Sequence, residues 1–503
     1  MSWTFCRGNA ERISRNCLAR IVRIACNGNP QPGILHVRLT KFTFALLAAI
    51  LSTSALAQSP ASSGAAQRVV DLASAAIAMR SVRGEGNQTS DVAALLRNTL
   101  VDAGWNADEI EIVPVDDTAY FIATWKGRDA SLGPIVISAH MDVVEAKPED
   151  WERDPFTPVV EDGYLFGRGA SDTKFDAVQA MVAVMDLRQS GFVPERSIVL
   201  AFSGDEETTM VTSKAIAERL RDAKLVLNVD GASGTLNEET GAPAYWSWQG
   251  AEKTYADLEL EVTNPGGHSS TPRDDNAIVQ LSQALVKIGA YRFTPELNDI
   301  TRDYFTNAAQ FEADPLLAAA MRAFAEDPAD KAAVAVLRGN PAFIGRIGTT
   351  CVPTQVEAGH ALNALPQRAT AYVNCRIFPG HAKEDIIAEL AKVAGEPAMT
   401  IREINPEYVV AAPASPYDAD FVGSVTRAIH AAFGEVPIIA SQASGASDSM
   451  WYRALGVPSY GASGTFSKDS DDYAHGLNER VSIGHIDKSL KYYDVLLRDL
   501  SSR

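Results

Sequence analysis

The spacing of apolar residues changes from helical to strand-like within the first 140 residues. From residue 67 to 104 they recur at helical spacing, as in Val70, Leu72 and Ile77. Further on they form short, uninterrupted runs rich in β-branched residues, a pattern typical of strands buried on both faces. The alternation of strands and helices favours an α/β fold with a mostly parallel sheet. Strands are predicted at Ile110–Val115, Ala119–Trp125, Gly133–His140, Ser197–Phe202 and Lys224–Val229, with a helix at Phe175–Leu187.

A different pattern begins near residue 254 and indicates a second, smaller domain. Apolar and polar residues alternate along Thr254–Thr263, as in a strand with one solvated face. The polar segment 293–342 has helical spacing and is expected to lie on the side of a lid. The order of elements is that of a small α+β, ferredoxin-like domain inserted into the first. Its other predicted elements are a helix at Asn276–Ile288, strands at Ile344–Val356 and Ala369–Ile377, a helix at Glu384–Val393 and a strand at Met399–Ile404.

The α/β pattern resumes near Val409, with a helix predicted at Asp418–Phe433. A chain of 503 residues is long enough for two domains with separate cores. We therefore expect a catalytic domain built from residues 66–250 and 408–503, and an inserted lid or dimerisation domain at residues 251–407.

The first 57 residues have the pattern of a secretory signal peptide with an extension before it. Arg38 and Lys41 precede the apolar run Phe42–Leu51, and Ala55-Leu56-Ala57 forms an A-x-A cleavage site. The apolar run is short for a membrane span, so no span is expected after cleavage near Ala57. A buried hydrophobic helix is the other interpretation of this run. Cleavage would place the mature protein in the periplasm or outside the cell, and residues 1–36 could be an over-long start of the reading frame.

Charge and cysteine content narrow the choice of partners and compartment. The formal net charge is −18, which argues against a nucleic-acid partner because such proteins present a basic face. Cys6, Cys17 and Cys26 precede the expected cleavage site, so the mature chain keeps only Cys351 and Cys375. These two lie in neighbouring predicted strands. A disulfide and a pair of buried thiols both fit this placement.

Residues that can bind metal follow three of the predicted buried strands. In an open parallel sheet, ligands bind beyond the carboxyl ends of the strands. Taken singly, each residue has a plainer explanation: a histidine can cap a core strand, an aspartate can cap a helix, and an acidic run can be a solvated loop. Their joint placement at one edge of a sheet favours a common site. The residues are His140, the acidic run Asp205-Glu206-Glu207, Asp230, and Asp172 at a glycine-rich turn before the predicted helix.

Together with His475, these residues would provide suitable ligands for two metal ions. Two imidazoles and three carboxylates suit a pair of zinc ions with one bridging carboxylate. Two Zn²⁺ ions carry four positive charges, which three carboxylates and one hydroxide neutralise, so that the cluster can be partly buried. The ligands expected are His140, Asp172, Glu207, Asp230 and His475, and cobalt or manganese could replace zinc.

Six short motifs in this order resemble those of the M20 family of metallopeptidases, and the resemblance extends from about residue 66 to the end of the chain. The segment from Trp151 to Phe156 and the length of the insertion look most like the carboxypeptidase S branch. Each motif alone is weak, whereas the ordered set is specific. The motifs are His140-Met141-Asp142, Gly167-Arg168-Gly169-Ala170-Ser171-Asp172, Asp205-Glu206-Glu207, Gly266-Gly267-His268-Ser269-Ser270, Asn363-Ala364-Leu365-Pro366 and His475-Gly476-Leu477-Asn478-Glu479-Arg480.

The resemblance implies a role for each matching residue. His140 and Asp230 would bind one zinc, Glu207 and His475 the other, with Asp172 bridging them. Asp142 would orient His140, and Glu206 would be the general base for a hydroxide that bridges the ions. His268 would stabilise the oxyanion, often across a dimer interface in this family, which implies a homodimer. Asn363 and Arg376 would hold a carboxylate of the substrate.

The chain departs from the family pattern near the proposed substrate pocket. Thr173 stands where relatives often carry Asp or Met, and Phe175 where they often carry Gly. Asp230 stands where many relatives have Glu. These changes keep the ligand set but leave the shape of the pocket open. The expected function is hydrolysis of an amide bond in a dipeptide, short peptide or N-acyl amino acid. The alternative is a catalytically silent metal- or peptide-binding protein on the same fold.

Overall fold

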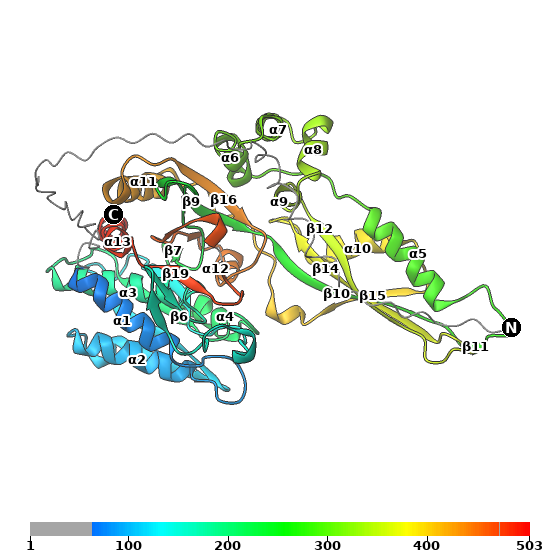
Figure 1. Cartoon of the computed structure of the whole chain (residues 1–503), viewed down its shortest axis with the longest axis horizontal. Coiled ribbons are helices and arrows are strands. Elements are labelled where there is room, and N and C mark those ends of the chain that lie inside the picture. The colour runs from blue at the N-terminus through cyan, green and yellow to red at the C-terminus, as the bar shows by residue number, and fades with distance from the viewer. Residues whose placement is uncertain (1–62, 472, 503) are drawn as a thin grey trace, which may run out of the picture. The chain divides into compact units, whose positions relative to one another are not determined.

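The computed structural model describes residues 63–471 and 473–502, and its largest element is a ten-stranded mixed sheet (Figure 1). The four central strands β6, β3, β7 and β17 run parallel, as predicted, whereas β1 and β2 at one edge pair antiparallel. The strand order is β1 (Ile110–Val115), β2 (Thr118–Trp125), β6 (Ile198–Ser203), β3 (Ile135–His140), β7 (Leu225–Asn228), β17 (Ser459–Gly461), β9 (Pro243–Glu252), β8 (Gly234–Leu236) and β18 (Phe466–Ser467), with β16 (Ile438–Ala443) pairing with β9.

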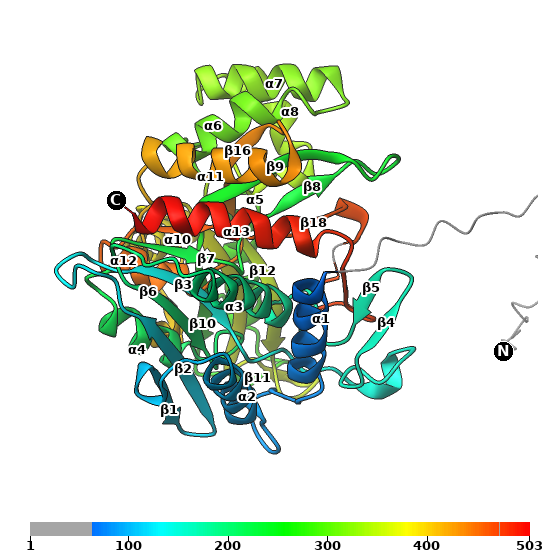
Figure 2. The same cartoon turned by 90° about the vertical axis from the view of Figure 1, so that its left-hand side faces the viewer.

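Helices cover both faces of this sheet, which explains why its central strands lack alternation (Figure 2). Ile135 and Ile137 of β3 belong to one apolar cluster, and Val136 between them belongs to the cluster on the other face. Buried on both sides, such strands appear as continuous apolar runs. The first face is covered by α1 (Gly64–Ile77), α2 (Thr89–Asp102), α3 (Lys174–Gln189), α11 (Ala419–Phe433) and α13 (Ile486–Ser501), and the second by α4 (Val211–Arg219) and α12 (Ser449–Ala454).

The inserted region forms a separate four-stranded antiparallel sheet with its own hydrophobic core. Helices α5 (Ala277–Ala290) and α10 (Lys383–Ala394) contribute Leu281 and Leu390 to this core. The predicted β-α-β-β-α-β order is present, although Ile344 ends a short helix and the second strand begins only at Thr350. The boundaries of the two domains remain a prediction. The sheet order is β12 (Thr350–Ala358), β14 (Arg368–Ile377), β10 (Thr254–Thr263) and β15 (Met399–Ile404).

The segment 293–342 is helical, as predicted, and packs along β16 at the edge of the large sheet. Asp303 accepts a hydrogen bond from the backbone N–H of Ala440 in β16 at 2.9 Å. Asn298 donates to the side chain of Gln442 at 2.9 Å. The segment therefore satisfies polar groups that an edge strand would otherwise present to solvent. Its helices are α6 (Asp299–Ala308), α7 (Pro315–Glu326), α8 (Lys331–Arg338) and α9 (Pro341–Ile344).

Two small sheets and four 3₁₀ turns complete the described elements. One sheet joins β4 (Val159–Glu161), β5 (Tyr164–Phe166) and β19 (Arg480–Ser482), and the other joins β11 (Gly267–His268) and β13 (Ala364–Leu365). The 3₁₀ turns are η1 (Ala107–Glu109), η2 (Pro148–Asp150), η3 (Pro406–Tyr408) and η4 (Asp469–Asp471).

Cys351 of β12 and Cys375 of β14 are neighbours in the sheet and form a disulfide with an S–S distance of 1.98 Å. The disulfide prediction is thus confirmed against the alternative of two thiols. Across residues 63–471 and 473–502, no helix is both long enough and apolar enough to span a membrane. The predicted signal peptide lies outside the described residues.

Candidate active site

The carboxyl ends of three adjacent parallel strands bring the predicted metal ligands together. His140 is the last residue of β3, Glu206 and Glu207 follow the end of β6, and Asp230 follows the end of β7. Because β6, β3 and β7 are neighbours, these side chains converge at one edge of the sheet. The predicted clustering of strand ends is therefore observed.

Asp172 lies between two histidines and presents one carboxylate oxygen to each. Its Oδ1 is 2.8 Å from Nε2 of His140, and its Oδ2 is 3.1 Å from Nε2 of His475. The set continues outward on both sides, because Oε2 of Glu207 lies 3.0 Å from His475 Nε2 and Oδ2 of Asp230 lies 3.8 Å from His140 Nε2. Two pairs of predicted ligands thus lie on either side of one central carboxylate, an arrangement that would suit a bridging ligand.

The charges and donor atoms of this cluster fit divalent metal. Ligand atoms of His140, Asp172 and Glu207 all lie within 4.8 Å of one another. Burial, together with neighbouring carboxylates, raises the pKa of Asp230 well above its usual range against the opposing charge of His140. Hydrogen bonds to Asp172 and Glu207 raise the pKa of His475 to about 10. The cluster thus favours positive charge, and its mixture of imidazole and carboxylate donors suits zinc.

Asp142 holds the loop that carries both glutamates. Its Oδ1 accepts the backbone N–H of Glu206 at 3.1 Å, and its Oδ2 accepts that of Glu207 at 3.0 Å. The backbone carbonyl of Asp142 lies 2.9 Å from Nδ1 of His140, closer than its carboxylate, which is 3.6 Å away. A contact on Nδ1 fixes the orientation of an imidazole ring, so Asp142 connects His140, a predicted ligand, to the paired glutamates.

A buried ion pair positions the loop that carries Asp172. Oε2 of Glu479 lies 2.6 Å from Nη1 of Arg168. Oε1 of Glu479 accepts the backbone N–H groups of Ser171 and Asp172 at 2.7 and 3.0 Å. Arg168 also donates to the backbone carbonyl of Gly476 at 3.2 Å, next to His475. One ion pair therefore fixes the two segments that carry Asp172 and His475.

The predicted tight turn before Asp172 depends on glycine. Gly169 has a φ of +89°, in the left-handed region that favours glycine. A Cβ atom there would lie only 2.9 Å from Cγ1 of Val143. The turn thus allows the backbone of residues 169–172 to approach Glu479 closely.

The three predicted residues of the inserted domain lie in two places. His268 and Asn363 are neighbours at the β11–β13 pair, where the N–H of Ser269 donates to the carbonyl of Asn363 at 3.0 Å. Both are exposed, and within residues 63–471 and 473–502 no hydrogen bond or ion pair joins them to the cluster of predicted metal ligands. Arg376 of β14 donates to the carbonyl of Ser444 at 3.1 Å, and its guanidinium lies 4.5 Å from the ring centroid of Tyr255.

A model of the peptidase family M20/M25/M40 matches residues 136–499. The chain belongs to this family. It is therefore an M20-type metallopeptidase or amidohydrolase, as predicted.

Two relatives illustrate the range of activities in the family. A Dictyostelium discoideum protein named "Probable carboxypeptidase S-like 2" is 28% identical over 392 residues, which cover 75% of this chain and 74% of the relative. The Xenopus tropicalis "N-fatty-acyl-amino acid synthase/hydrolase PM20D1" is 28% identical over 383 residues, covering 74% of each chain. Two relatives named for different activities thus have the same sequence identity to this protein, 28%.

Solved M20 structures confirm the fold class. The metallo-carboxypeptidase Sso-CP2 of Sulfolobus solfataricus aligns with a TM-score of 0.64 at 20% identity, covering 87% of this chain and 99% of that one. The Bacillus subtilis YXEP protein, described as a dinuclear metal binding peptidase from the M20 family, aligns with a TM-score of 0.54 at 14% identity, covering 87% and 98%. The family includes dinuclear metal peptidases, and this chain has a candidate metal-binding group.

Sequence reasoning gave no role to three buried residues near the cluster. Arg168 and Glu479 belong to two of the quoted motifs, but the motifs assign no function to either side chain. Asp448 lies in the loop 444–448, for which the sequence indicates no function. Asp448 accepts a hydrogen bond from Ser203 at 2.7 Å, and burial raises its pKa to about 6. A charged residue within a glycine-rich motif is a usable signal for Arg168, but no sequence pattern identifies its partner.

Proposed function

We propose that this M20 protein is a di-zinc hydrolase that cleaves the amide bond of an N-acyl amino acid, a dipeptide or a short peptide. The observation that carries the proposal is the carboxylate of Asp172, which presents one oxygen to His140 and the other to His475. His140 with Asp230, and Glu207 with His475, would hold the two ions, and Asp172 would contact both. Divalent ions held by these residues would supply Lewis-acid polarisation of the scissile carbonyl and a lower pKa for the attacking water.

Glu206 is the proposed general base. Its side chain is buried, and burial raises its pKa well above the usual range against the opposing charge of His140. A carboxylate with a raised pKa can take a proton from water and later deliver it to the leaving nitrogen. The hydrogen bond from the backbone N–H of Glu206 to Asp142 keeps this residue at a fixed place in the loop.

Arg376 and Asn363 are the proposed contacts for a free carboxylate of the substrate. Arg376 is half-buried and lies next to the loop at Ser444, and its planar guanidinium suits a bidentate contact with a carboxylate. If the contact is made, Arg376→Ala should lower kcat/KM on the order of a hundredfold. An unchanged kcat/KM would remove Arg376 from the site.

His268 is proposed to complete the site of a partner subunit in a homodimer. Support comes from an exposed apolar surface on the inserted domain, where α5 lies against the edge strand β12. Val286 of α5 and Val352 and Val356 of β12 are exposed there, which is unusual for a surface that stays in water. Mixing the inactive variants His268→Ala and Glu206→Ala should restore partial activity if the subunits exchange. No recovery from a mixed dimer would show that His268 acts within its own chain or not at all.

The proposed location is the periplasm or the outside of the cell. The disulfide between Cys351 and Cys375 supports it, because such bonds persist in oxidising compartments. Finding the mature amino terminus near Gln58 in exported protein would test the proposed cleavage after Ala57.

The decisive experiment measures bound metal and amide hydrolysis together, in the chain beginning at Gln58 and in its Glu206→Ala variant. We expect about two zinc ions in both proteins, with hydrolysis only in the first. Substrate pairs such as N-acetyl-leucine and a Leu-containing dipeptide would separate aminoacylase from peptidase activity. Full metal content with no turnover of any amide by the unmodified chain would favour the metal- or peptide-binding alternative.

A further inference from the structure

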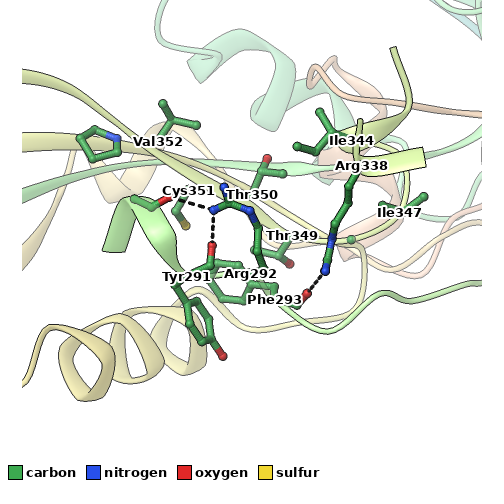
Figure 3. A pocket seen from close by; sticks show the side chains of 13 residues that line it. Tyr291, Arg292, Phe293, Arg338, Ile344, Ile347, Thr349, Thr350, Cys351 and Val352 are labelled. Atoms are coloured by element: carbon green, nitrogen blue, oxygen red, sulfur yellow. Dashed lines mark hydrogen bonds between the residues drawn. The ribbon is translucent and has the colours of Figure 1, made fainter. Parts of the chain in front are cut away.

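A cavity of about 270 Å³ lies in the inserted region, at the end of α5 and the start of β12 (Figure 3). None of the proposed metal ligands lines it. Its volume lies just below the range of about 300–1,000 Å³ that is usual for small-molecule sites, so it suits a compact ligand. Its lining residues are Gly289, Tyr291, Arg292, Phe293, Arg338, Ile344, Ile347, Gly348, Thr349, Thr350, Cys351, Val352 and Pro353.

Two arginines in this lining have no acidic partner within the described part of the chain. Nη1 of Arg292 donates to the carbonyls of Gly289 and Tyr291 at 2.8 and 2.7 Å. Nη2 of Arg338 donates to the carbonyl of Phe293 at 2.7 Å. A guanidinium has five N–H donors, so both groups keep donors for a ligand. In a chain with 63 acidic and 45 basic residues, two neighbouring unpaired arginines are unexpected.

The positive charge at this cavity is not neutralised by its surroundings. Burial and the charge of Arg292 both lower the pKa of Arg338. The lining contains no Asp or Glu side chain. An anion bound here would relieve the repulsion between the two guanidinium groups, whereas an ammonium group would have no partner.

Apolar side chains form the rest of the lining. Phe293 and Ile347 are buried, while Val352 remains 57% exposed. Figure 3 shows Ile344, Ile347 and Val352 around the stretch Thr349–Cys351, with the two arginines beside it. A simple inorganic anion gains nothing from such surfaces, whereas a carboxylate with an apolar chain contacts them and the guanidinium groups together.

Lys253 holds one side of the cavity in place. Its buried ammonium group donates to the carbonyls of Gly345 and Gly348 at 3.0 and 2.8 Å, and to the hydroxyl of Thr350 at 3.1 Å. Gly348 and Thr350 belong to the lining, so this side chain fixes the loop that faces the arginines. A preformed site loses less free energy to ordering when a ligand binds.

We propose that this cavity is a binding site for a small organic monocarboxylate that has an apolar chain and no ammonium group. Arg338 binds the carboxylate, Arg292 supplies a second positive charge, and the chain of the ligand lies against Phe293, Ile347 and Val352. The proposal does not depend on the proposed hydrolytic function, because its residues are separate from the metal cluster.

Calorimetric titration of the chain beginning at Gln58 with hexanoate tests the site. A carboxylate can also bind the metal cluster, so the decisive comparison is between variants that differ only at the cavity. Charge-assisted hydrogen bonds to a ligand predict that Arg338→Gln weakens one hexanoate-binding event about tenfold to a hundredfold. Arg322→Gln, which removes an arginine of α7 outside the cavity, is the matched control and should bind as the unmodified protein does.

A second variant guards against loss of folding. Ile344→Asp changes an exposed position of the lining, outside the proposed dimer surface, and places a negative charge at the cavity, so it should also weaken hexanoate binding at least tenfold. Hexanol, leucine and inorganic phosphate should each bind at least tenfold more weakly than hexanoate. Unchanged hexanoate affinity in a folded Arg338→Gln protein would overturn the site, and equal affinity for phosphate or leucine would overturn the class of ligand.

Discussion

Oδ1 of Asp142 accepts the backbone N–H of Glu206 at 3.1 Å, so the proposed base is held by a residue only two positions after a proposed metal ligand, His140. The same carboxylate binds the N–H of Glu207 through its other oxygen, at 3.0 Å. The two adjacent glutamates can therefore have different functions, base and metal ligand, although Asp142 binds the backbone of both. Their functions should be separable by mutation.

Glu206→Gln should abolish most hydrolysis without releasing metal. Glutamine keeps the size of the side chain but cannot accept a proton, and loss of a general base typically lowers kcat by about 10²–10⁴-fold. Elemental analysis should still find two ions. Glu207→Gln is the matched control, because it should lose one ion as well as activity. A Glu206→Gln protein with near-normal kcat would exclude this residue as the base.

Adding zinc to chelator-treated protein at pH 7.5 should release protons. Hydrogen bonds to Asp172 and Glu207 raise the pKa of His475 to about 10, so its imidazole is protonated at this pH. Zinc requires the neutral ring, and binding must therefore expel the proton. The apparent affinity for zinc should rise with pH up to about 10, where His475 loses its proton unaided. Calorimetry in buffers of different ionisation enthalpy measures the release, and zinc binding without it would contradict the assignment of His475 as a ligand.

Glu479→Gln should lower both stability and metal affinity. Arg168 would keep its charge in a buried position without its carboxylate partner, and breaking such a pair costs on the order of 3–5 kcal/mol. Glutamine keeps an amide oxygen that can still accept the backbone N–H groups of the loop carrying Asp172, but without the negative charge these hydrogen bonds should be weaker. Thermal unfolding and zinc titration measure the two effects. The double variant Arg168→Met/Glu479→Gln should recover part of the stability, and an equal loss in both variants would mean that the charge of Arg168 is not the cause.

Replacing both Cys351 and Cys375 by serine should destabilise the inserted domain by about 3 kcal/mol. The two cysteines are 24 residues apart, and the estimate is the chain entropy that a closed loop of this size removes from the unfolded state. Chemical denaturation under non-reducing conditions measures the difference. Reduction of the unmodified protein should have a similar effect, and mass mapping that finds two free thiols would exclude the bond.

The elements that sequence predicted well are those buried on both faces or strictly alternating. Thr254–Thr263 and Met399–Ile404 have the predicted bounds because the pattern of each matches its exposure. Strand β9 was not predicted, since its buried residues include the polar Gln249 and Glu252, which hydrogen bond to each other. No element was predicted for β16 either, whose polar neighbours come from the distant segment of α6. Tertiary contacts decide such strands, and no local pattern contains them.

Sequence also located most of the candidate site but little of its support. The predicted ligands do come together in the structure: His140, Asp172, Glu207, Asp230 and His475. Most of them could be predicted because they follow strand ends or a glycine turn that the sequence indicates. The sequence did not identify the partner of Arg168, because Glu479 lies 311 residues further along the chain and only folding brings the two together. His268 and Asn363 were predicted as neighbours of the substrate, and their exposed position leaves that role as a prediction.

The hydrogen bond from the N–H of Asp172 to Glu479 spans 307 residues of the chain. During synthesis, the ribosome completes the segment that carries Asp172 long before it reaches Glu479. The nascent chain therefore contains the three strands that precede His140, Glu207 and Asp230 before it contains His475 and Glu479. If the cluster binds metal as proposed, we expect binding only after Glu479 has been synthesised, and a chain that stops before this residue would lack the proposed site.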